Sequence, residues 1–183
     1  MSDEGKVMRP EHVFKKFAWR SSLEVGEALE RSTTWTIGGV AAVVAVLIGN
    51  LDSASKIASL DGIKIAVVLF TLSLLFGAMS KILGMAVTAG VKTLRQTEAF
   101  LGSESGLSLM SEMTSEPDQL VRELAEPFLW PLSIVMRASG ALGLKDYLAA
   151  DKRFVKMFCL QIALNGMHVL LFIAALLSIG FSI

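Results

Sequence analysis

The chain has 183 residues, of which 53% are apolar and 19% charged, and its 17 basic side chains balance its 17 acidic ones. The apolar content excludes disorder over the whole chain, and the single cysteine, Cys159, excludes a disulfide framework or a multi-cysteine metal site. The balanced charge gives no support to nucleic-acid binding, which needs a surplus of basic side chains. We therefore expect lipid and protein partners and no nucleic acid.

The segment 1–32 is predicted to be a cytoplasmic, amphipathic N-terminal region that is helical from Pro10 to Arg31, because proline suits a first helical position. Basic residues beside an aromatic face suit an anionic membrane surface. The side chains predicted to lie on that surface are Phe14, Lys15, Lys16, Phe17 and Arg20. The alternative is that this face packs on other protein.

Three long apolar runs predict an all-α integral membrane protein with three transmembrane helices, at residues 33–51, 63–91 and 157–183. A hydrocarbon core about 30 Å thick needs roughly 20 helical residues, and each run reaches that length. The second run includes a cytoplasmic extension, and its Lys81 is expected to extend to the head groups at the inner interface.

Basic residues indicate how the chain is oriented in the membrane. Six precede the first run and eight follow the second, whereas only Lys56 and Lys64 lie between Leu51 and the uncharged stretch that starts at Ile65. The positive-inside rule then places the N-terminus and the loop 92–156 in the cytoplasm. The short loop 52–62 and the C-terminus are expected outside, and the membrane is expected to be a bacterial inner membrane.

The loop 92–156 is predicted to contain a flexible, serine-rich part followed by amphipathic or interfacial helices. Its segment 124–144 is apolar on average but contains Glu126, Arg137 and two prolines. A fourth crossing there would translocate a basic cluster, so charge argues against it. We expect this segment to lie along the cytoplasmic face, pack on the helices, or enter the membrane and return.

A polar face on the third span is the strongest candidate for chemistry. Gln161, Asn165 and His168 are spaced i, i+4 and i+7 and therefore share one side of a helix. An ionisable residue inside a membrane suggests proton relay, ion passage or cofactor ligation. The alternative, which we favour because no span contains a carboxylate, is hydrogen bonding between helices. No metal or cofactor site is predicted.

Small residues at four-residue spacing occur on every span and allow helices to approach closely. They predict packing against other membrane subunits or against copies of this chain. The predicted helix-packing residues are Ala41, Ala45, Gly49, Ser80, Gly84, Thr88, Ala174 and Ser178.

No catalytic residue is predicted, because the sequence has no HExxH, GxSxG, Walker A or GxGxxG motif. The expected function is that of a non-enzymatic integral membrane subunit or scaffold of a larger assembly, such as a bacterial secretion or conjugation machine. One alternative is an oligomeric channel or transporter lined by the polar face of the third span. Another is a membrane-remodelling or stress protein that acts through the N-terminal helix.

Overall fold

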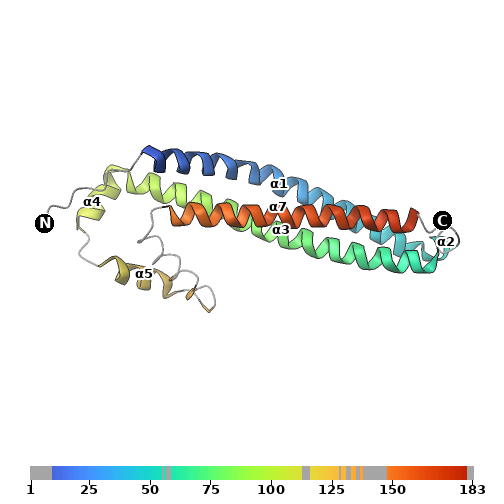
Figure 1. Cartoon of the computed structure of the whole chain (residues 1–183). Coiled ribbons are helices and arrows are strands. Elements are labelled where there is room, and N and C mark those ends of the chain that lie inside the picture. The colour runs from blue at the N-terminus through green and yellow to red at the C-terminus, as the bar shows by residue number, and fades with distance from the viewer. Residues whose placement is uncertain are drawn as a thin grey trace. The chain divides into compact units, whose positions relative to one another are not determined.

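The computed structural model describes residues 10–54, 56, 59–112, 116–127, 129–130, 133–134, 137 and 148–180. Within these ranges the regular structure is entirely helical (Figure 1). The long helices are α1 (Pro10–Gly49), α3 (Leu60–Leu101) and α7 (Ala149–Gly180), and the short ones are α2 (Leu51–Ala54), α4 (Glu104–Glu112) and α5 (Pro117–Ala125).

The three long helices confirm the prediction of an all-helical chain with three apolar helices long enough to cross a membrane. At a rise of 1.5 Å per residue they are about 60, 63 and 48 Å long, whereas one crossing needs about 30 Å. Length and composition are thus consistent with a membrane location.

The helix ends differ from the ends of the apolar runs. Helix α1 joins the predicted N-terminal helix and the first run, α3 continues past Val91 to Leu101, and α7 begins at Ala149. The reason is that hydropathy marks the part of a helix that suits lipid, while charged residues continue the same helix in water. The predicted segment 124–144 lies largely outside the described residues, as do residues 1–9 and 181–183.

Serine side chains mark two helix starts. The Ser59 hydroxyl accepts a hydrogen bond of 3.2 Å from the backbone N–H of Gly62 at the start of α3. Ser103 accepts an equivalent bond of 3.2 Å from the N–H of Gly106 at the start of α4. Each serine therefore satisfies one of the backbone donors that a helix leaves unpaired in its first turn.

The chain divides into two compact units. The first, which we call the charged unit, comprises the residues up to Leu23 together with Ala89–Lys156. The second, which we call the apolar unit, comprises Glu24–Thr88 and Met157–Ile183. The polar face predicted on the third run lies in the apolar unit, whereas most basic residues lie in the charged unit.

In the apolar unit, buried and half-buried positions recur at alternating spacings of three and four residues on all three helices. On α3 they are Ala66, Phe70, Ser73, Gly77, Ser80, Gly84 and Val87. On α1 they are Gly26, Glu30, Thr33, Ile37, Val40, Val44 and Leu47, and on α7 they are Phe158, Gln161, Asn165, His168, Phe172, Ala175 and Ile179. This is the heptad spacing of left-handed helix packing. We call this set of positions the seam.

One part of the seam is wholly apolar. Val40, Ala66, Phe70 and Ala175 form a buried cluster, and the rings of Phe70 and Phe172 meet with centroids 6.0 Å apart and planes tilted by 44°. Such a tilted aromatic pair is a favourable packing arrangement. The remainder of the seam carries the polar residues.

Candidate functional site

His168 is fully buried at the centre of a polar layer of the seam. Its Nδ1 lies 2.8 Å from both the backbone oxygen and the hydroxyl of Ser73. The backbone oxygen can only accept, so this contact is a hydrogen bond when Nδ1 carries the hydrogen. The hydroxyl of Ser73 donates to the backbone oxygen of His168 at 2.8 Å. On the other side of the ring, Nε2 lies 3.1 Å from the hydroxyl of Thr36. Residues from α1 and α3 thus engage both ring nitrogens.

With the hydrogen on Nδ1, the hydroxyl of Thr36 can donate to Nε2. The hydroxyl of Thr36 has one hydrogen, which can point to Nε2 or to the backbone oxygen of Thr33 at 3.0 Å. The layer can therefore satisfy the imidazole entirely from within the chain.

A second polar layer joins α1 and α7. The hydroxyl of Thr33 lies 2.8 Å from the side-chain oxygen of Asn165 and also 2.8 Å from the backbone oxygen of Leu29, to either of which it can donate.

The interhelical hydrogen bonds show in which direction each helix runs. The pairs Thr33–Asn165 and Thr36–His168 are both 132 residues apart in the sequence. Because this difference in residue number is constant, α1 and α7 run parallel in this unit. From the pair Ser73–His168 to the pair Ser80–Gln161, the residue number rises on α3 and falls on α7, so α3 runs antiparallel to both.

The third polar layer contains Gln161. The hydroxyl of Ser80 donates to its backbone oxygen at 3.0 Å, but its side-chain nitrogen and oxygen have no hydrogen-bond partner among the described residues. Gly84 makes room for the amide, because a Cβ there would lie 2.6 Å from Gln161 Nε2. The same Cβ would lie 3.5 Å from Cγ of Glu30 on α1, so a carboxylate side chain meets this layer.

The charged unit contains an ion-pair cluster that joins α1, α3 and α7. Arg20 binds both carboxylate oxygens of Glu98 at 2.6 and 2.7 Å, and its Nε donates to Asp151 at 2.9 Å. Lys16 also binds Glu98, at 2.7 Å. The side chain of Asp151 is only 3% exposed, so removing Arg20 would leave a buried carboxylate without this partner.

These ion pairs set the charge state of the cluster. The hydrogen bonds from Arg20 lower the pKa of Glu98 from 4.5 to about 2, against the opposing effect of burial and with a smaller contribution from Lys16. Bonding to Glu98 and Asp151 likewise raises the pKa of Arg20 above its ordinary value. Both groups therefore stay charged at neutral pH.

The residues predicted to lie on a membrane surface divide into two groups. Phe14 and Phe17 are 71% and 68% exposed, and Lys15 is exposed as well. Lys16 and Arg20 instead point to Glu98, a partner that the sequence analysis did not include. A contact of the exposed group with lipid stays a prediction.

The predicted helix-packing residues also divide. Ser80 and Gly84 are buried in the seam, and Ala174 and Ser178 are half-buried. Thr88 is exposed, as are the three predicted packing residues of α1, namely Ala41, Ala45 and Gly49. The small-residue face of α1 is thus not covered by any described part of the chain.

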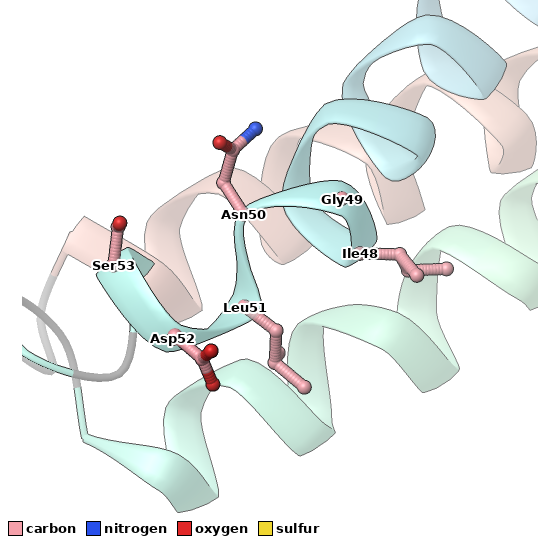
Figure 2. A pocket seen from close by; sticks show the side chains of 6 residues that line it. All are labelled: Ile48, Gly49, Asn50, Leu51, Asp52 and Ser53. Carbon is pink, nitrogen blue, oxygen red and sulfur yellow. The ribbon is translucent and has the colours of Figure 1, made fainter.

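The described residues form no group of histidine, cysteine and carboxylate side chains suited to a metal ion. A hollow of about 400 Å³ is lined by Ile48–Ser53 at the turn between α1 and α2 (Figure 2). Figure 2 shows Asn50 pointing away from Leu51 and Asp52, and its amide donates to the backbone oxygen of Val46 at 2.9 Å. The polar side chains that line this hollow therefore do not point toward a common centre, as they would in a ligand-binding site.

No protein-family model, curated protein or solved structure matches this chain.

Proposed function

We propose that the chain is a non-enzymatic integral membrane subunit that assembles through α1 with other membrane proteins or with copies of itself. The observation that carries this proposal is the exposed small-residue face of α1. Ala41, Ala45 and Gly49 lie on it at four-residue spacing, and a Cβ on Gly49 or on the neighbouring Gly38 would meet no atom within 4 Å. In lipid, such faces let helix backbones approach each other closely.

The distribution of polarity in the apolar unit supports insertion in a bilayer. The seam holds Thr33, Ser73, Ser80, Gln161 and His168, all fully buried. Many large apolar side chains face outward instead, among them Val46, Val68, Leu72, Leu75, Ile82, Leu160, Leu170 and Leu177. In water this arrangement would expose the groups that the hydrophobic effect buries, whereas in hydrocarbon it places polar groups where they can bind each other.

The hydrogen bonds of the polar face support a role in helix association more than a role in lining a channel. His168 and Asn165 bond to side chains of this same chain, on α1 and α3. Interhelical bonds of this kind contribute about 0.6–2 kcal/mol each inside membranes. The channel or transporter, the membrane-remodelling role and the secretion or conjugation setting stay predictions.

Assembly through α1 is tested by enlarging the exposed small residues. We expect the wild-type chain, purified in mild detergent, to form a defined particle heavier than the 19.7 kDa chain with its bound detergent. The double variant Ala41→Leu, Ala45→Leu should reduce the protein mass, measured by light scattering, to that of one chain. The matched controls Ala78→Leu and Ala163→Leu change exposed alanines on α3 and α7 and should keep the particle intact.

Two results would contradict the proposal. The first is a wild-type protein that is extracted from its native membrane as a single, partnerless chain. The second is a double variant on α1 that assembles as well as both control variants, because the small-residue face would then have no part in the contact.

We further propose that the N-terminus and the loop between α3 and α7 lie in the cytoplasm, as the distribution of basic residues favours. Cys159 is the one cysteine of the sequence, so Cys159→Ser gives a cysteine-free background. In that background, Ser53→Cys should react with a membrane-impermeant maleimide on intact cells. Ser108→Cys should react only after permeabilisation, and the reverse pattern would refute the orientation.

A further inference from the structure

We infer that Gln161 marks a water-binding site inside the seam, entered beside Glu30 and closed at its other end by the apolar cluster around Phe70. The inference concerns the interior of the apolar unit and does not depend on the proposed assembly through α1.

The side-chain amide of Gln161 is the observation from which the site follows. The residue is fully buried, yet neither its nitrogen nor its oxygen has a hydrogen-bond partner among the described residues. The amide offers two donors and one acceptor. Buried polar groups of native proteins almost always find partners in protein or in ordered water, because leaving them unpaired is unfavourable.

The chemistry of this amide selects water as the ligand. A cation would bind the side-chain oxygen and leave the amide hydrogens unpaired. An anion would bind those hydrogens but would lie near an acidic side chain, that of Glu30, whose Cγ packs over Gly84 beside the amide. Water both donates and accepts, and it needs only two to four polar partners in a small space.

The surrounding residues place the entrance and the closed end. A Cβ on Gly84 would lie 2.6 Å from Gln161 Nε2 and 3.5 Å from Glu30 Cγ, so both side chains pack over this glycine. Glu30 is half-buried and thus retains contact with the outside of the unit. Further along the seam come the layers of Asn165 and His168, and then the cluster that contains Phe70.

Water contact at the amide can be measured directly by nuclear magnetic resonance. The protein would be labelled with ¹⁵N-glutamine and reconstituted in lipid nanodiscs, and Gln161→Leu would assign the signal among the three glutamines, Gln96, Gln119 and Gln161. We expect the side-chain amide of Gln161 to show cross-peaks to water and exchange in D₂O. Backbone amides of ¹⁵N-valine and ¹⁵N-phenylalanine samples at Val40 and Phe70 should show neither. A Gln161 amide without water contact would overturn the inference.

Variants at the entrance test whether the Gln161 amide binds water or is only buried among side chains. Gly84→Ala puts a methyl group 2.6 Å from Gln161 Nε2, so the amide must move from its present place. Glu30→Leu makes the entrance apolar. Each variant should remove the cross-peak to water. Glu30→Gln keeps the entrance polar, and Gly166→Ala adds a methyl group in open space on α7, so both should retain it. If Gly84→Ala fails to fold, the comparison of Glu30→Leu with Glu30→Gln decides, and equal water contact in these two variants would refute the proposed entrance.

Discussion

Replacing Gly77 by alanine should weaken the packing of the three helices at the layer of His168. A Cβ at this position would lie 2.8 Å from Cγ1 of Ile37 and 3.0 Å from Nδ1 of His168. Favourable contacts between carbon atoms lie at about 3.5–4.0 Å, so the first neighbour must move by about 0.7 Å or more. Cγ1 of Ile37 moves only with χ1, which branching at Cβ restricts in a helix, and His168 is held by its bonds to Ser73.

The size of the effect follows from two opposing contributions. Forcing an extra methyl group into a packed core typically costs about 1–3 kcal/mol, and weakening one interhelical hydrogen bond adds about 0.6 kcal/mol. Alanine recovers up to about 1 kcal/mol through its better helix propensity. We therefore expect Gly77→Ala to lower the free energy of unfolding by about 1–2 kcal/mol.

The assay is equilibrium unfolding in mixed detergent micelles, followed by far-ultraviolet circular dichroism. Gly39→Ala and Gly166→Ala are matched controls, because a Cβ at either glycine meets no atom within 4 Å. Both controls should leave stability unchanged or raise it slightly. If Gly77→Ala behaved like these two variants, the close approach of α1, α3 and α7 at this layer would be refuted.

Two further predictions concern hydrogen positions and charge. In a His12→Gln background, ¹⁵N spectra of the remaining histidine, His168, should show a hydrogen on Nδ1. An Nδ1 without hydrogen would contradict the bond from Nδ1 to the backbone oxygen of Ser73. The pKa of Glu98 is lowered to about 2, so its stabilising contribution is complete above about pH 4.5 and is lost as the pH falls towards 2. Glu98→Gln should remove that part of the acid dependence of the free energy of unfolding. It should lower this free energy by about 1 kcal/mol at pH 7, because the side chain is 35% exposed and its pairing with Arg20 is partly screened by solvent. An unchanged dependence of stability on acid pH would refute the ion pair.

Hydropathy predicted the three long helices because an apolar run of about 20 residues is almost always a helix, either in a membrane or in the hydrophobic core of a protein. It could not predict where each helix ends. The charged stretches that precede Thr33 and follow Val91 belong to α1 and α3. Their residues have good helix propensity, so the helix continues where the apolar composition stops.

The polar face could be predicted only in part. The spacing of Gln161, Asn165 and His168 within α7 indicated a shared side, and all three lie on the seam. Their partners Thr33, Thr36 and Ser73 were missed because spacing within one helix says nothing of the height and rotation of its neighbours. The alternating spacing of Ser73, Gly77, Ser80 and Gly84 was a usable indication, since small and polar residues at heptad spacing mark a helix interface.

The polar layers give the seam a unique alignment. Apolar heptad positions would pack nearly as well after one helix slid along another by seven residues, because the pattern repeats at that spacing. Such a shift would separate Thr33 from Asn165 and Thr36 from His168, and would leave these buried side chains without their present partners. A buried polar group specifies alignment in this way in coiled coils, at some cost in stability. The hydrogen bonds of His168 and Asn165 therefore favour the present position of α7 against its neighbours, and the apolar contacts around Phe70 add packing without fixing the alignment.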